Sequence, residues 1–143
     1  MVVIGFTGTR KGATAAQLRV VRGLLATQRD PAEEDWLHHG DAIGADEQIH
    51  GIAKELGYKV AIHPSNISSQ RAFCEWDRAY RMTYPLSRNC NIVTRCSQLL
   101  ACPFEADEQP KGGTWFTIRY ARAVCRPVAI ILPNGLIRLE NRQ

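Results

Sequence analysis

The sequence has no apolar run long enough to cross a membrane and no basic segment ahead of its first apolar stretch. A membrane-spanning helix needs about 20 apolar residues, so none is expected here. The first residues, MVVIGFTGTR, run directly into a glycine-threonine turn, which is typical of a buried strand and not of a secretion signal. We therefore expect a cytoplasmic protein without a membrane partner.

Paired cysteines are also lacking, because the five cysteines are an odd number and form no C-x-x-C pair. Without an export signal, we interpret them as reduced thiols that pack as small hydrophobic side chains. Zinc-ligand spacings of the usual kind are absent, and His39 with His50 makes only a weak metal-binding pattern. The sequence therefore predicts no metal site and no resident cofactor.

A strong excess of one charge is missing as well. The chain has 18 Lys and Arg against 14 Asp and Glu, a net charge of +4 that is spread along its length. Arginine forms most of the excess, and guanidinium groups pair with phosphate oxygens in a bidentate manner. This balance suits phosphate recognition, but it is too dilute to favour nucleic acid as the partner.

The sequence does contain a regular alternation of strand-like and helix-like segments. Strands are predicted at 2–7, from 36 onward, and at 58–63, 97–102 and 127–132. Helices are predicted after a capping box at 14–17, up to a cap at Gly57, over 86–95 and 114–124, with a shorter one at 73–80. This alternation indicates an α/β fold: one Rossmann-like domain over 1–143, with a doubly wound parallel sheet of about five strands and helices on both faces. The tail from 134 is expected to add at most a small edge strand.

Two of the loops that follow predicted strands carry residues suited to an anion. They are Gly8, Thr9 and Arg10 after the first strand, and Gly112, Gly113 and Thr114 before the last helix. In open α/β sheets, ligands bind beyond the carboxyl ends of the strands, where helix N-termini point backbone N–H groups outward. Glycines let the backbone approach an anion closely, so the second loop is predicted to cradle a phosphate group.

A third loop, after the second strand, carries acids as well as glycine. Gly40 and Asp41 lie in the loop, where Asp41 is a candidate for binding sugar hydroxyls. Asp46 and His50 are four residues apart and share one face of the following helix. Asp46 is equally accounted for as a first-turn acid that the helix dipole favours.

The order of these motifs resembles the SLOG superfamily over nearly the whole chain. This superfamily joins the DNA-processing protein A family to the LOG cytokinin-activating phosphoribohydrolases. Gly8-Thr9-Arg10 is similar to the Gly-Ser-Arg turn of the first family, and residues 40–50 are similar to its S-G-G-A-x-G-I-D-x-x-A-H motif. Gly112-Gly113-Thr114 resembles the P-G-G-x-G-T phosphate loop of the superfamily. HPSN, RAF and GGTW-x-TIRYA are similar to a branch of small stand-alone members.

The resemblance implies a nucleotide site at the carboxyl ends of the strands, and a homo-oligomer. Arg88, with Asn89, stands where LOG-like proteins carry an Arg-Lys pair. Arg71 or Arg88 is a candidate for charge-assisted contacts with the phosphate. Trp115 is a candidate for stacking on a base, with a place in the core as the equal alternative. The LOG glutamate that assists glycosidic cleavage is replaced here by the sequence Trp115-Phe116-Thr117.

Three functions follow from these residues. The leading hypothesis is binding of a nucleotide or nucleotide-derived phosphate ligand. The first alternative is a nucleotide N-glycosidase, in which a carboxylate steadies the transition state, with Asp41, Asp46 and Glu47 as available acids and Arg88 orienting the phosphate. The second alternative is single-stranded nucleic-acid binding, which would be recognised by a steep dependence on salt.

Overall fold

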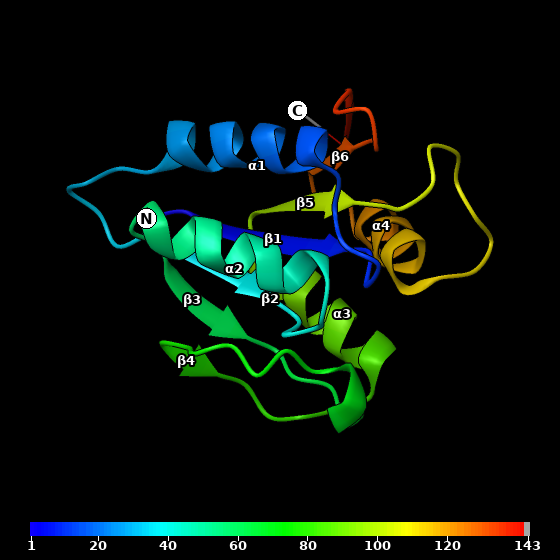
Figure 1. Ribbon diagram of the computed structural model, residues 1–143, viewed down its shortest axis with the longest axis horizontal. Coiled ribbons are helices and arrows are strands. Elements are labelled where there is room, and N and C mark those ends of the chain that lie inside the picture. The colour runs from blue at the N-terminus through cyan, green and yellow to red at the C-terminus, as the bar shows by residue number, and fades with distance from the viewer. Residues whose placement is uncertain (142–143) are drawn as a thin grey trace.

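The computed structural model describes residues 1–141 as a seven-stranded sheet flanked by four helices (Figure 1). The strands are β1 (Val3–Gly8), β2 (Trp36–His39), β3 (Lys59–Ile62), β4 (Arg78–Ala79), β5 (Gln98–Cys102), β6 (Val128–Ile131) and β7 (Ile137–Glu140). The helices are α1 (Ala15–Gln28), α2 (Ala45–Glu55), α3 (Pro85–Arg95) and α4 (Gly113–Ala123), with a short 3-10 helix at Ser68–Gln70. The strand order across the sheet is β4-β3-β2-β1-β5-β6-β7.

The predicted α/β class and parallel sheet are confirmed, but the number of strands differs from the prediction. The sequence predicts about five strands, and these correspond to β1, β2, β3, β5 and β6, which all pair in parallel. The two further strands lie at the edges, β4 beside β3 and β7 antiparallel to β6. Two residues are too few to give β4 a detectable period. The side chains of β7 are mostly exposed, so it lacks the apolar pattern of a buried strand.

The sheet separates two apolar cores, one under each pair of helices. Helices α1 and α2 run side by side over one face and share the first core, and α3 and α4 share the second (Figure 1). Strand β5 shows the division, because Leu100 and Cys102 belong to the first core and Leu99 and Ala101 to the second. Successive residues of a strand point to opposite faces, so a central strand must be apolar throughout.

The region between β3 and α3 contains no helix where the sequence predicts one over 73–80. The chain there is extended and adds β4 to the edge of the sheet. The Tyr80 N–H donates to the Ile62 carbonyl at 2.9 Å, and the Asp77 carboxylate accepts the Val60 N–H at 2.8 Å. The extended chain therefore pairs with backbone groups at the edge of β3. A helix over 73–80 would have left those groups of β3 without these partners.

The strand order reverses between β1 and β5. From β1 the chain winds outward through β2 and β3 to β4, then crosses to the other side and continues through β5 to β6. In Figure 1 the arrows of β1 and β5 lie side by side and point to the same edge of the sheet. A crevice forms outside the carboxyl ends of two such strands, because their connections leave in opposite directions.

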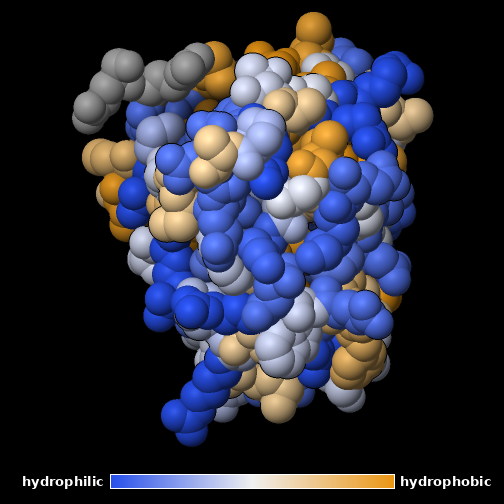
Figure 2. All heavy atoms as spheres, turned by 90° about the vertical axis from the view of Figure 1, so that its left-hand side faces the viewer, coloured by the Kyte–Doolittle hydropathy of each residue, from blue (hydrophilic) through white to orange (hydrophobic). Residues whose placement is uncertain are grey.

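The opposite edge of the sheet, where the strands begin, faces the viewer in Figure 2. Its surface is mostly hydrophilic, with scattered hydrophobic atoms.

Within residues 1–141, none of the helices combines the length and apolar character needed to pass through a lipid bilayer.

Helix α1 begins at the predicted capping box, which the structure confirms. Thr14 is the N-cap, its hydroxyl accepts the Gln17 N–H, and the Gln17 side chain accepts the Thr14 N–H at 2.9 Å. The Gln17 amide also donates to the carbonyls of Pro103 and Ile131, both at 2.9 Å. This buried side chain therefore joins α1 to the ends of β5 and β6.

We expect Gln17→Leu to lower the free energy of unfolding by about 2–4 kcal/mol, because it removes three hydrogen bonds and leaves buried groups unpaired. Chemical denaturation followed by circular dichroism measures the change. Gln28→Leu on the same helix is the control, since it removes only a half-buried contact with Gln98 and should cost under about 1 kcal/mol. Equal losses in the two variants would contradict the assigned role of Gln17.

Candidate functional site

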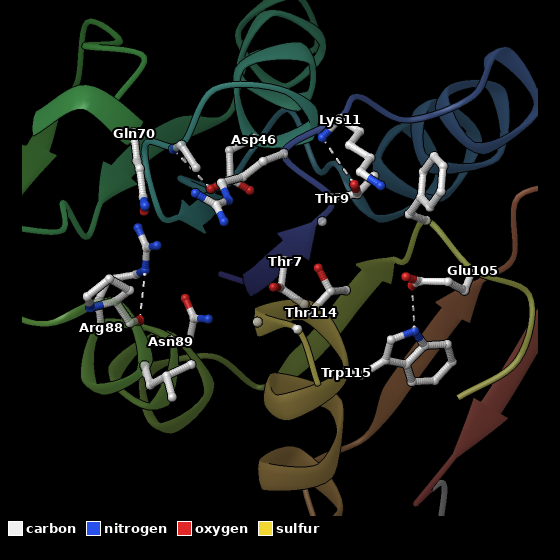
Figure 3. A pocket seen from close by; sticks show the side chains of 18 residues that line it. Thr7, Thr9, Lys11, Asp46, Gln70, Arg88, Asn89, Glu105, Thr114 and Trp115 are labelled. Carbon is white, nitrogen blue, oxygen red and sulfur yellow. Dashed lines mark hydrogen bonds between the residues drawn. The ribbon is translucent and has the colours of Figure 1, made fainter. Parts of the chain in front are cut away.

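A cavity of about 610 Å³ opens at the carboxyl ends of β1 and β5, where the strand order reverses. Figure 3 shows side chains from the loops after β1, β2 and β5 and from the first turns of α3 and α4 around this space. The predicted residues that line it are Gly8, Thr9, Arg10, Asp46, Arg88, Gly112, Gly113, Thr114 and Trp115. All three predicted loops therefore contribute to one site, although they are far apart in the sequence.

The N-terminus of α4 forms one wall of the cavity. Gly112 is the N-cap and no side chain caps the helix. The first α-helical bond runs from the Phe116 N–H to the Gly112 carbonyl at 3.0 Å, so the N–H groups of residues 113–115 precede it. Gly112 has a φ of 103°, a conformation that favours glycine. Uncapped N–H groups at a helix N-terminus are suited to binding an anion.

The loop after β1 is held rigidly against the start of α2. The Ala45 N–H donates to the Thr9 carbonyl at 3.0 Å, and Gly44 lies so close to the backbone of Arg10 that a Cβ atom would collide with it. The Lys11 ammonium lies over the Phe104 ring, 4.1 Å from its centroid. The loop therefore presents two cationic side chains to the cavity from a fixed backbone and reaches across to the loop after β5.

Arg88 lies in the first turn of α3 and is 8% exposed. Its Nη1 donates to the carbonyls of Gly40 and His63, and its Nε donates to the Pro85 carbonyl at 3.2 Å. A Cβ atom on Gly40 would collide with the guanidinium, so glycine is required there to admit the arginine. Gly40 does not itself line the cavity. Its contribution is to leave room for the Arg88 guanidinium and to accept a hydrogen bond from it.

Asp46 lies in the first turn of α2 and is 5% exposed. Its Oδ2 accepts the N–H groups of Gly40 at 3.0 Å and Ala42 at 3.2 Å, whereas its Oδ1 has no hydrogen-bond partner. Burial raises the pKa of Asp46 to about 6, against the lowering effect of the nearby Arg88 cation. The cavity wall therefore contains one buried carboxylate oxygen without a donor.

Asp41 and Arg71 lie outside the cavity lining and bind each other. The fully buried Asp41 carboxylate accepts the Arg71 Nε–H at 2.9 Å and the Cys74 N–H at 2.8 Å, and the Asp41 carbonyl accepts the Ala72 N–H. Asp41 thus holds the segment 71–74 against the end of β2. The structure places neither side chain where it meets a ligand in this cavity.

Trp115 lines the cavity but is only 1% exposed, because its ring packs in the second apolar core. Its indole N–H donates to the Glu105 carboxylate at 3.1 Å (Figure 3). Of the two interpretations that the sequence leaves open for Trp115, the structure supports the core. The ring face is occupied by the core and is not offered to a base.

Several lining residues are not among those predicted. They are Thr7, Lys11, Ala42, Gln70, Pro85, Leu86, Asn89, Phe104 and Glu105. Asn89 stands beside Arg88 in the sequence and Lys11 beside Arg10, so extending those two motifs by one residue would have included them. Gln70 ends the short 3-10 helix before the RAF motif and Glu105 lies in the long loop after β5, and only the folded chain brings them to the cavity.

The four histidines form two buried or half-buried pairs outside the lining of the cavity. The His38 Nδ1 lies 2.8 Å from the His63 Nε2, and the His39 Nε2 lies 3.0 Å from the His50 Nδ1. The Asp41 N–H donates to the His39 Nδ1, so the proton of neutral His39 is on Nε2 and points to His50. Burial lowers the pKa of His39 to about 3 and that of His63 to about 3.

Ligand atoms of His39, His50 and Cys74 lie within 4.8 Å of one another. Metal binding by His39 would need the lone pair of Nε2, and its Nδ1 would then have to carry a proton. The Asp41 N–H already donates to Nδ1, so Nδ1 has no acceptor beside it to which it could donate a proton of its own. The donor set therefore fits a hydrogen-bonded histidine pair better than a metal site.

Comparison with known proteins identifies relatives by structure alone. The sequence matches no protein-family model and no curated protein. The molybdenum cofactor binding protein from the phototrophic bacterium Rippkaea orientalis has a similar fold, with a TM-score of 0.70 and 20% identity over 92% of this chain and 76% of that one.

Two further solved structures share the fold. The Moco carrier protein from Chlamydomonas reinhardtii has a TM-score of 0.61 and 22% identity, covering 93% of this chain and 76% of that one. The structural-genomics target TM1055 has a TM-score of 0.63 and 15% identity, covering 90% of this chain and 72% of that one. These likenesses show a Rossmann-like fold of the predicted kind.

The contacts of Asp41 make a prediction that separates a structural role from a ligand contact. We expect Asp41→Asn to lower the free energy of unfolding by about 2–3 kcal/mol, because it weakens hydrogen bonds between charged groups in a buried place. Limited proteolysis should then cut within 71–74 more rapidly. Glu75→Gln, an exposed change immediately after this segment, should alter neither measurement. Unchanged stability in Asp41→Asn would contradict the role assigned to this carboxylate.

Proposed function

We propose that this protein binds a phosphate-bearing, nucleotide-derived ligand in the cavity between β1 and β5. The observation that carries the proposal is that the uncapped N-terminus of α4 and the guanidinium of Arg88 line the same cavity. A helix N-terminus and an arginine are both complementary to phosphate, through backbone N–H groups and charge-assisted hydrogen bonds.

The charges around the cavity support an anionic ligand. Arg10, Lys11 and Arg88 line it, against the carboxylates of Asp46 and Glu105. Glu105 is engaged by the Trp115 indole, and the pKa of Asp46 is raised by burial. The balance of charge is therefore positive, and the threonines of the β1 loop and of α4 add hydroxyl donors.

The size and place of the cavity support a small molecule as the ligand. A volume of about 610 Å³ lies within the range of about 300–1,000 Å³ that is usual for small-molecule sites. The reversal of strand order is where ligands of open α/β sheets bind. Two proteins of the same fold are named for binding or carrying the molybdenum cofactor, a ligand of nucleotide-derived type.

N-glycosidase activity is the second candidate, and one observation favours it. Asp46 is a cavity carboxyl whose pKa is raised to about 6, within the range in which a general acid or base works near neutral pH. Asp41, the other acid considered from the sequence, is engaged with Arg71. Release of free base from any nucleotide that binds, measured by chromatography, separates hydrolysis from binding alone.

A thermal-shift panel at fixed salt tests the proposal. It contains nucleoside monophosphates, ADP-ribose, molybdenum cofactor under anaerobic conditions, the matching nucleosides without phosphate, and a short single-stranded DNA. A ligand at 100 times its dissociation constant stabilises the fold by about 2.7 kcal/mol, which is readily measured. Stabilisation by phosphates but not by nucleosides supports the proposal. Binding of DNA alone, with a steep loss of affinity as salt rises, would favour the nucleic-acid alternative instead.

The wall formed by α4 makes a specific prediction at Gly113. Proline is well tolerated at the first position of a helix, where its missing N–H costs no helical bond. We expect Gly113→Pro to weaken phosphate binding by about tenfold or more, because it removes one N–H that is available to the anion. Isothermal titration calorimetry measures the affinity.

Gly113→Ala is the matched control. It adds the same Cβ atom, which would lie 3.5 Å from the Asn89 amide nitrogen in ordinary contact, and it keeps the N–H. The difference in affinity between the two variants reports the replacement of the N–H by the proline ring. Equal affinities, with both variants folded, would contradict phosphate binding at this helix N-terminus.

A further inference from the structure

Asp46 offers its two carboxylate oxygens to different surroundings. Oδ2 is held by the N–H groups of Gly40 and Ala42, which fix the orientation of the carboxylate. Oδ1 is buried without a partner, and among the side-chain oxygens of residues 1–141 it is alone in this respect. Figure 3 shows Asp46 on the wall of the cavity away from Thr114, with a hydrogen bond drawn to its carboxylate.

An unpaired oxygen of this kind has an energetic cost. A buried polar atom without a hydrogen bond costs about 1–3 kcal/mol, and more when it is charged. The nearby Arg88 guanidinium does not pair with it, because its Nη1 and Nε donate to backbone carbonyls. No donor of residues 1–141 pairs with Oδ1, and the residue that carries it lines the cavity.

We propose that Asp46 is the specificity-determining acceptor of the site: its Oδ1 accepts a hydrogen bond from a hydroxyl or amino group on the body of the ligand, while the phosphate lies at α4. The inference rests on the proposed function. It narrows the ligand to phosphate esters whose non-phosphate part carries an O–H or N–H donor. Inorganic phosphate satisfies the α4 end of the cavity and leaves Oδ1 unpaired.

The raised pKa of Asp46 is consistent with this assignment. Burial stabilises the neutral acid, which can donate as well as accept, and the donor of a bound ligand would stabilise the charged form. A carboxylate placed against the phosphate itself would repel it. A position on a separate wall, facing the body of the ligand, avoids that repulsion.

Asp46→Asn is a sharp test because the loop dictates how the amide must lie. The N–H groups of Gly40 and Ala42 require an acceptor, so the amide oxygen takes the place of Oδ2 and the NH₂ group takes the place of Oδ1. The variant keeps both loop hydrogen bonds and converts the free acceptor into a donor. It should fold, and only ligands that bring a donor to this position should be rejected.

Calorimetry on the wild type and the variant uses four probes: inorganic phosphate, AMP, 2′,3′-dideoxy-AMP, and purine riboside 5′-monophosphate, which lacks the amino group. We expect Asp46→Asn to weaken the affinity for AMP by about 10- to 100-fold. The affinity for inorganic phosphate should stay unchanged or rise slightly. An analogue that lacks the donor should bind the wild type and the variant equally well. If this analogue is 2′,3′-dideoxy-AMP, the donor is a sugar hydroxyl, and if it is purine riboside 5′-monophosphate, the donor is the amino group. Glu47→Gln is the control, since it removes one charge from the same turn of α2 at an exposed position outside the lining.

The outcomes separate this inference from the function on which it rests. If wild-type protein binds neither phosphate, nor AMP, nor any phosphate compound of the thermal-shift panel, the proposed function fails and the inference falls with it. If wild-type protein binds phosphate but Asp46→Asn leaves AMP unaffected, or weakens phosphate and AMP equally, the proposed function stands and the role of Asp46 is overturned. A loss of AMP affinity of the same size in Glu47→Gln would also overturn it, because the effect would be one of charge alone.

Discussion

The buried guanidinium of Arg88 is the contact on which the geometry of the site depends. It joins the carbonyl of Gly40 after β2, the carbonyl of His63 after β3 and the first turn of α3. An arginine side chain presents its donors in a fixed plane, so one group sets the relative positions of three chain segments. The arrangement requires glycine at position 40, because any side chain there would occupy the space of the guanidinium.

Burying this cation also sets the electrostatics of the cavity. Burial lowers the pKa of Arg88, and the carboxylates of Asp46 and Asp41 oppose that effect. The same burial shifts the pKa of Asp46 in the opposite direction, raising it to about 6 despite the nearby cation. The two groups remain separate, each held by backbone atoms. Each therefore keeps hydrogen-bonding capacity that a direct ion pair would have used.

The predictable part of this protein is the part that local patterns determine. The β-rich apolar runs, the capping box at Thr14 and Gln17, and the glycines before α4 each depend on neighbouring residues, and their positions follow from spacing. The edge strand β7 lies in the tail where a small edge strand is expected, and it pairs with the preceding strand β6 although it lacks the apolar period of a buried strand. The edge strand β4 has only two residues and pairs with β3 across a long loop, so no local pattern marks it. For the same reason Gln70 and Glu105 could not be assigned to the site, since only tertiary structure brings their loops to the cavity.

Asp41 and Asp46 show why a motif alone could not assign the roles of its acids. Both follow β2 within a few residues, both are buried, and either could be matched to a carboxylate that meets a sugar. Asp41 has a φ of 55°, and its carboxylate turns toward the segment 71–74, where both oxygens find donors. Asp46 lies beyond the loop, in the first turn of α2, and only one of its oxygens is used by the loop. The difference lies in the segment 71–74, which supplies donors to both oxygens of Asp41 and none to Asp46, so one oxygen of Asp46 stays without a hydrogen bond.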